Sequence, residues 1–230
     1  MKKALILTTG LLVGFGFTSK AFATKLETIE QKASYTLASD IAQNLKSQGL
    51  EIDIDAFTQG LTDVFENNPS KMTEQEKAQA IKAIKQKVMA KQLANHAKAS
   101  KENFEESKKF FAENAKKPGV KTLENGIQYR VIKAGKGNSP TATDNIVAHY
   151  EGRLIDGTVF DSSYDRGTPF KFQMGNVIKG WGEALKMMKP GDKWEVTIPS
   201  ELAYGQRGAG DRIGPNQALI FIIELVSFSK

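Results

Sequence analysis

The stretch from Thr73 to Lys117 contains neither glycine nor proline, and it constrains the fold more than any other feature of the sequence. Thr73 is followed three residues later by Glu76, which is the capping-box pattern that begins a helix. Pro118-Gly119 then ends the run, because proline cannot continue a helix. The pattern predicts a single helix of roughly 40 residues, about 60 Å long at ~1.5 Å per residue.

The two halves of this predicted helix differ in apolar content. Ile81, Ile84 and Val88 recur at helical spacing in the first half. The second half, with the sequence KQLANHAKASKENFEESKK at residues 91–109, is almost entirely polar. A helix that is polar on every side has no core to lie on, so we expect either a solvated bridge between two domains or an unstable segment.

Two shorter helices are predicted before the long one. Apolar residues at three- and four-residue steps indicate the first, which Gly49 ends. Asp55 is the expected N-cap of the second, which Asn67-Asn68-Pro69 ends. The apolar stripe of the first helix consists of Leu26, Ile29, Ala33, Leu37, Ile41 and Leu45.

These helices carry too few large apolar side chains for a thick core. We therefore expect residues 24–88 to pack against a second copy of themselves, since a closed twofold dimer is the commonest arrangement. A self-sufficient small bundle is the alternative, but small cores are only weakly stable.

The first 23 residues have the pattern of a secretory signal peptide. Met1-Lys2-Lys3 is positively charged, residues 4–17 are apolar, and Ala21-Phe22-Ala23 places small residues where a signal peptidase cleaves. The apolar run is shorter than the roughly 20 residues that span a bilayer. We expect cleavage after Ala23, export and no integral membrane segment afterwards; a retained membrane anchor is the rival interpretation.

Charge and composition exclude several classes of function. The formal net charge is +6, and removal of Lys2, Lys3 and Lys20 with the signal leaves 6 − 3 = +3, too little to favour a nucleic-acid partner. The chain has no cysteine and two histidines, so disulfides, thiolate chemistry and a metal site are not expected. We predict no cofactor.

After Pro118 the sequence changes from a helical pattern to one of period two, with more glycine and β-branched residues. A single short helix, Trp181 to Met188, interrupts the strands, which indicates an α+β domain whose sheet curls around that helix. Predicted strands are Ile127–Lys133, Ile146–Glu151, Thr158–Asp161, Phe170–Met174, Trp194–Ile198 and Leu219–Phe228, the last being central.

The segment from Tyr150 to Arg166 raises the question of function. A two-residue turn at Asp156-Gly157 would place Tyr150 and Asp161 on one otherwise apolar face, where the carboxylate needs a partner. Arg166 is the nearest candidate. Phe160 would point to the other face unless a bulge turns it. The alternative is that Asp161 and Arg166 only staple a loop.

Four motifs after residue 122 resemble the FK506-binding-protein family of peptidyl-prolyl isomerases. They are AHYEGRLIDGTVFDSS, GTPFKFQMGNVIKGW, MKPGDKWEVTIPSELAYG and GPNQALIFIIELVS, in the family's order and at its intervals. The whole chain is similar to the branch typified by the macrophage infectivity potentiators of pathogenic bacteria. That branch has a signal peptide, a helical dimerisation segment, a long linking helix and an isomerase domain.

The resemblance implies an apolar substrate pocket that includes Phe160, and hence a bulge near Asp161. It also implies that FK506-like macrolides inhibit the isomerase activity. Asp161, Tyr204 and Tyr150 would act on the amide, and the substrate-binding residues would be Phe160, Arg166, Phe170, Val177, Ile178, Trp181, Ile213 and Phe221. The chain departs from the family's pattern at Ala209 and Arg212, in the loop after Tyr204.

The favoured interpretation is an exported dimeric isomerase of X-Pro bonds in folding proteins, with chaperone activity through a dimeric cradle. Two alternatives stay open: a holdase with incidental isomerase activity, and a host-surface adhesion or binding module. Residues 1–23 would be the signal peptide, 24–117 the dimerisation segment and linking helix, and 118–230 the isomerase domain. We expect the protein in the periplasm, at the outer membrane or at the cell surface.

Overall fold

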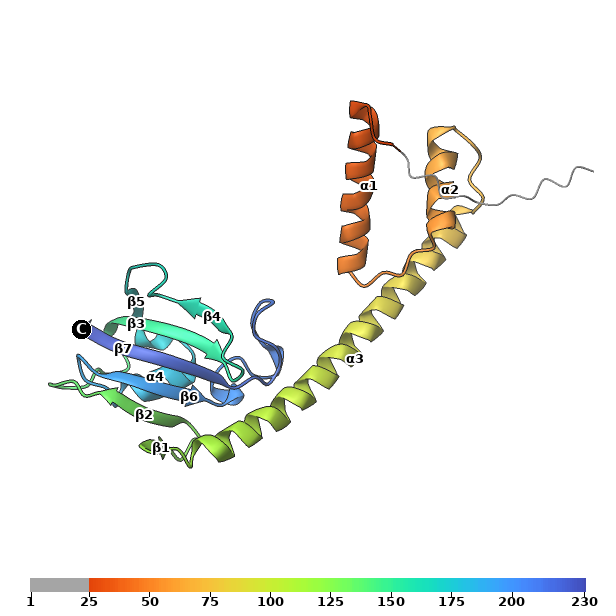
Figure 1. Cartoon of the computed structure of the whole chain (residues 1–230). Helices are drawn as coiled ribbons and strands as arrows, with labels where there is room; N and C mark the ends of the chain where they lie inside the picture. The colour runs from red at the N-terminus through yellow and green to blue at the C-terminus, as the bar shows by residue number, and fades with distance from the viewer. Residues whose placement is uncertain (1–24) are drawn as a thin grey trace, which may run out of the picture. The chain divides into compact units, whose positions relative to one another are not determined.

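The computed structural model of the 230-residue chain describes residues 25–230 (Figure 1). The predicted signal peptide, residues 1–23, lies outside the described residues. The chain divides into two compact units, one ending at Lys77 and the other comprising Ala78–Lys230. The division falls inside the long helix. Among residues 25–230, no helix is long and apolar enough to cross a membrane.

The first unit contains the two predicted short helices, α1 (Ile29–Ser47) and α2 (Ile54–Phe65). The N-cap of α2 is Asp53 and not Asp55: the Asp53 carboxylate accepts the Ala56 N–H at 2.9 Å. The prediction of Asp55 was wrong by two residues, because both aspartates fit the N-terminal pattern and only the backbone decides which one lies outside the helix.

Apolar side chains of α1 and α2 remain open to solvent. No residue of either helix is buried. Ile29, Val64 and Phe65 are 81%, 74% and 82% exposed, which is unusual for large apolar side chains on one helical pair. Within the described chain, these side chains therefore have no core that covers them.

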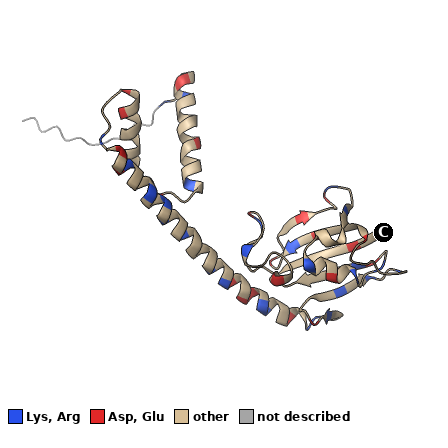
Figure 2. Cartoon of the chain, turned by 180° about the vertical axis from the view of Figure 1, so that it is seen from behind, with Lys and Arg blue, Asp and Glu red and all other residues tan. Residues whose placement is uncertain are grey.

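The long helix α3 spans Glu74–Asn114, as the absence of glycine and proline predicted. Its capping box is formed, since Glu76 accepts the Thr73 N–H at 2.7 Å and the Thr73 hydroxyl accepts the Glu76 N–H at 3.2 Å. Lysine residues lie along most of its length, and glutamate residues lie near its two ends (Figure 2). The expectation of a solvated bridge holds for residues 91–98, which are exposed, but fails nearer the end of the helix, where Ser107 and Asn114 are buried against the sheet domain.

The second unit contains an antiparallel sheet of seven strands. The strands are β1 (Val120–Thr122), β2 (Gln128–Lys133), β3 (Asn145–Leu154), β4 (Val159–Ser162), β5 (Phe170–Gln173), β6 (Lys193–Ile198) and β7 (Leu219–Ser229). Their order is β1-β2-β6-β7-β3-β4, and β5 also pairs with β3. The predicted central position of β7 is confirmed; β1 was not predicted, because three residues carry no readable alternation.

Helix α4 (Lys179–Leu185) packs on the concave face of the sheet (Figure 1). Trp181 and Leu185 are 4% and 0% exposed and join the core formed by the strands. Gly180 permits this close approach, because a Cβ at that position would lie 2.3 Å from the Ile198 side chain. The α+β fold with a sheet curled around one short helix is confirmed.

Candidate active site

The β3–β4 connection differs from the predicted two-residue turn. Four residues, 155–158, join the strands, and the Gly157 N–H donates to the Leu154 carbonyl at 3.0 Å. The Asp156 carboxylate accepts the Thr158 N–H at 2.8 Å. An aspartate that satisfies the backbone two residues on favours this wider turn.

A bulge at Phe160 decides which side chains face the cavity. Gly152 pairs with Asp161 but Arg153 pairs with Val159, so Phe160 is the extra residue, as the family resemblance required. The bulge turns the Phe160 ring over Gly152. A Cβ on Gly152 would lie 2.6 Å from that ring, so only glycine leaves room for it.

Residues from four strands, α4 and two loops line one cavity of about 320 Å³. It includes nine of the eleven predicted site residues. The lining consists of Tyr150, Phe160, Asp161, Phe170, Asn176, Val177, Ile178, Trp181, Tyr204 and Phe221. Of the two others, Arg166 binds the outer side of Asp161, and Ile213 is buried in the adjoining core. Asn176 was not predicted, and no pattern singles out an asparagine in a polar loop.

The floor of the cavity is an aromatic cluster centred on Trp181. Its ring centroid lies 5.0 Å from that of Tyr150 and 5.3 Å from that of Phe221, both nearly perpendicular. Phe172 lies 5.6 Å from Trp181 and stacks on Phe170 at 5.0 Å. Phe172 supports two lining residues and was missed by sequence reasoning, although two aromatics separated by one lysine in β5 were the available signal.

Tyr150, Asp161 and Arg166 form a closed polar triangle at the cavity wall. The Tyr150 hydroxyl donates to one Asp161 oxygen, Arg166 donates to the other, and Arg166 also donates to the Tyr150 oxygen at 2.9 Å. Burial alone would raise the pKa of the Asp161 carboxyl, but the bonds from Tyr150 and Arg166 outweigh it and lower that pKa. Asp161 is therefore a fixed anion at neutral pH.

Tyr204 lies at the cavity rim and is 40% exposed. Burial, followed by the charge of Asp161, raises the pKa of its phenol, so the hydroxyl keeps its proton. Arg212, on the same loop, donates to the Phe160 carbonyl at 2.7 Å and ties the loop to the bulge. The arrangement is an apolar cavity with a small number of polar groups around its edge, as in sites that bind peptides or small ligands.

The two halves of the chain match two family models. Residues 136–226 match the FKBP-type peptidyl-prolyl cis-trans isomerase model. Residues 30–131 match the model of the domain amino-terminal to FKBP-type peptidyl-prolyl isomerase. The sheet, the cavity and the matches to these two family models together define the class of the protein. It is a peptidyl-prolyl cis-trans isomerase.

Similarity to individual proteins extends over the full length. The chain is 44% identical to the peptidyl-prolyl cis-trans isomerase Mip of Coxiella burnetii, over 100% of both chains. It is 39% identical to the outer membrane protein MIP of Legionella longbeachae, over 97% of both. The crystal structure of FkpA from Escherichia coli superposes with a TM-score of 0.73 at 37% identity, covering 89% of this chain and 99% of that one. The chain belongs to the FKBP-type peptidyl-prolyl isomerase family.

Proposed function

We propose that this isomerase is exported, acts as a dimer on proline-containing segments of folding proteins, and uses the cavity around Trp181 as its active site. The observation that carries the proposal is the cavity itself, with an aromatic floor and the fixed Tyr150–Asp161–Arg166 triangle on one wall. No nucleophile or cofactor is needed, because rotation about an X-Pro bond makes and breaks no covalent bond.

The chemistry follows from the electronic structure of the amide. The rotational barrier of a peptide bond, ~18–20 kcal/mol, comes from resonance that separates charge between oxygen and nitrogen. The twisted transition state has lost most of this resonance, so an apolar cavity disfavours the planar form more than the twisted one. An acceleration of about 10⁴ requires only about 5.5 kcal/mol, which desolvation and a few oriented dipoles can supply.

Each side chain has a proposed role in this scheme. Trp181 carries the proline ring, and Phe160, Phe170, Val177 and Phe221 enclose it. The Tyr204 hydroxyl and the Ile178 N–H hold substrate carbonyls; Ile178 is the N-cap of α4, so its N–H lies outside the helical ladder. Asp161 faces the twisting amide from a position that Tyr150 and Arg166 fix.

The dimer is proposed from the exposed apolar side chains of the first unit. Ile29, Val64 and Phe65 are each more than 70% exposed. A second copy of the chain would bury them, and a twofold interface is self-complementary by symmetry. The match of residues 30–131 to the amino-terminal domain of this family supports the same segment.

Export is proposed from the signal pattern of residues 1–23 and from the full-length similarity to a protein named an outer membrane protein. A periplasmic or outer-membrane isomerase meets unfolded chains that cross the inner membrane. An added chaperone role belongs to the same proposal, with the long α3 helices of the two copies forming a cradle for such chains.

Two refolding assays test the proposed combination of activities. For a client whose refolding is limited by proline isomerisation, we expect the chain to accelerate refolding, and an FK506-like macrolide to abolish the acceleration. For a client without a proline-limited step, we expect suppression of aggregation that the macrolide leaves intact. Loss of both effects with the macrolide would contradict separate isomerase and chaperone surfaces.

A further inference from the structure

The polar half of α3 carries a set of side chains on one face, at two-turn spacing. Ser100, Ser107 and Asn114 are seven residues apart, and Phe104 and Phe111 lie beside them with the same spacing. Ser107 and Asn114 are 8% and 4% exposed, so the sheet domain covers this face at these two positions, whereas Phe104 remains 47% exposed. The proposed isomerase chemistry makes no use of any of these residues.

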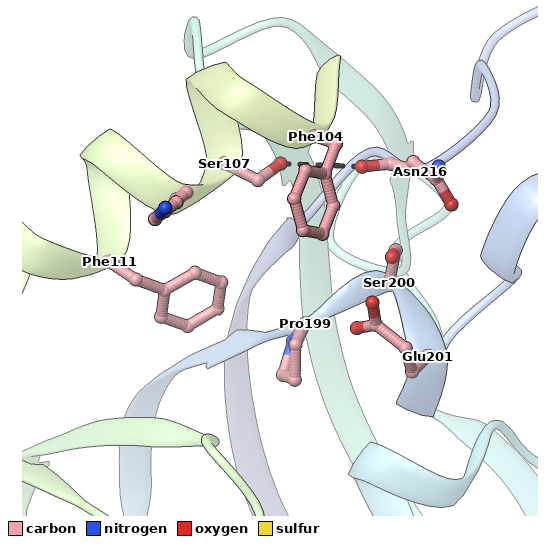
Figure 3. A pocket seen from close by; sticks show the side chains of 8 residues that line it. Phe104, Ser107, Phe111, Pro199, Ser200, Glu201 and Asn216 are labelled. Atoms are coloured by element: carbon pink, nitrogen blue, oxygen red, sulfur yellow. Dashed lines mark hydrogen bonds between the residues drawn. The ribbon is translucent and has the colours of Figure 1, made fainter. Parts of the chain in front are cut away.

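This face binds the segment that leads into β7. Asn103 Nδ2 donates to the Pro215 carbonyl at 2.8 Å, and Asn216 Nδ2 donates to the Ser100 hydroxyl at 2.8 Å. The Ser107 hydroxyl accepts the N–H of fully buried Ala218 at 3.1 Å and donates to the Asn216 carbonyl at 3.4 Å. Figure 3 shows Ser107 reaching Asn216, beside a groove into which Phe104 and Phe111 point.

Asn216 connects the helix to the cavity rim. Its backbone has φ +55°, a left-handed conformation that is uncommon outside glycine and that its side-chain bonds to α3 help to hold. Its N–H donates to the Gly205 carbonyl at 2.8 Å, directly after Tyr204. Both ends of the loop 205–216 are thus fixed at the point where α3 binds it.

We propose that Ser100, Asn103 and Ser107 are positioning residues for peptidyl-prolyl isomerisation. They act through Pro215 and Asn216 on the loop 205–216, which follows Tyr204 at the cavity rim. The linking helix is then a functional part of the isomerase domain and not only a spacer. The proposal rests on the assignment of Tyr204 to the substrate site.

The test uses the full chain with alanine at all three positions (Ser100→Ala, Asn103→Ala, Ser107→Ala), because alanine preserves helix propensity. The matched control is Glu105→Ala with Lys109→Ala, an oppositely charged pair exposed on the same helix. The readout is kcat and KM for an X-Pro peptide, measured well below the melting temperature. Asn216→Gly is the second variant; it retains the left-handed backbone and removes only the amide side chain.

We expect the triple variant and Asn216→Gly to lower kcat/KM about 3- to 10-fold, mainly by raising KM, since a displaced loop weakens binding by about one hydrogen bond. The control should match the parent. A purely structural role would lower the melting temperature and leave both constants unchanged, and that result overturns the proposal. If the triple variant does not fold, Asn216→Gly alone decides in the same way.

A double-mutant cycle with Tyr204→Phe separates this proposal from the site assignment. If the helix acts through Tyr204, its effect on kcat/KM should shrink in the Tyr204→Phe background. An effect of equal size in both backgrounds overturns the positioning role. If Tyr204→Phe alone leaves kcat/KM at the parent value, the site assignment fails instead, and the positioning role fails with it.

Discussion

At the scale of single residues, the wall of the cavity combines a charge with an apolar surface. Asp161 keeps its charge because Tyr150 and Arg166 bind it, and Phe160 reaches the cavity because one bulge reverses the alternation of β4. The alternation of the sequence alone placed Phe160 on the wrong face. Only the family resemblance required the bulge, since one extra residue leaves no mark in a pattern of period two.

Two substitutions test whether this wall is functional. Asp161→Leu and Tyr204→Phe should each lower kcat/KM for a short X-Pro peptide and leave the fold intact. The side chains of Asp161 and Arg166 are 43% and 49% exposed, so Asp161→Leu should cost less than about 1 kcal/mol of stability. Tyr204→Phe should not change the melting temperature. Parent kinetics in both variants would mean that the hairpin is only scaffold.

The pH dependence of stability provides a check on the triangle. The folded-state pKa of Asp161 is lowered, so its stabilising contribution is present above its unfolded pKa, near ~4, and is lost as pH falls through the folded value. Asp161→Asn should therefore be less stable than the parent at pH 7, and the difference should shrink as pH falls below the unfolded pKa and vanish below the folded pKa. Melting curves of both proteins across this range measure it; a constant difference contradicts the assignment.

At the scale of elements, the length of α3 was predictable and its packing was not. The absence of glycine and proline, together with the capping box and the Pro118-Gly119 stop, indicated a helix close to the observed 41 residues. The hydrogen bonds between α3 and the sheet domain, here called the seam, come from serine and asparagine side chains of α3: Ser100, Asn103, Ser107 and Asn114. A search for apolar residues at helical spacing does not detect such polar positions. Asn114 Nδ2 donates to the Gln128 side chain at 2.9 Å, and Gln128 Nε2 donates to the Phe111 carbonyl at 2.9 Å. Buried polar groups of this kind are visible only once the partner surface is known.

Two shortened chains test this seam. A chain that begins at Lys98 retains the helix face, whereas one that begins at Pro118 leaves Gln128 and the Ala218 N–H without their α3 partners. Removal of α3 opens these groups to water, so each lost hydrogen bond costs its net contribution of about 0.5–1.5 kcal/mol, and the chain from Pro118 should melt at the lower temperature. We expect both to isomerise X-Pro peptides, because every cavity residue lies at or after Tyr150. The chain from Pro118 should have the lower kcat/KM, because it lacks Ser100, Asn103 and Ser107. Equal melting temperatures would show that the seam contributes no stability.

At the scale of the whole molecule, the strong patterns were read correctly. The α+β fold, the order of helical and sheet parts and the central strand all follow from long periodic segments and from four family motifs. What covers the apolar side chains of α1 and α2 depends on how the protein assembles with other chains. A single chain determines which side chains are exposed, but not what covers them.

Sedimentation addresses that question. The full chain should sediment at twice its monomer mass. Val64→Lys with Phe65→Glu should produce monomers, because charges on a buried apolar interface are costly. Gln59→Lys, a change at an exposed polar position of α2, is the control and should remain dimeric. A parent chain that is monomeric at micromolar concentration would exclude the proposed dimer.

The most direct test of the central claim is the isomerisation rate of an X-Pro peptide with increasing amounts of an FK506-like macrolide. Tryptophan fluorescence, to which Trp181 and Trp194 contribute, is recorded in the same titration. The account predicts acceleration by the chain alone. It also predicts that the loss of acceleration and the change in fluorescence are complete at the same ratio, one macrolide per chain. The reason is that the peptide and the macrolide compete for the cavity whose floor is Trp181. Undiminished acceleration with the macrolide bound would contradict the assignment of that cavity as the active site.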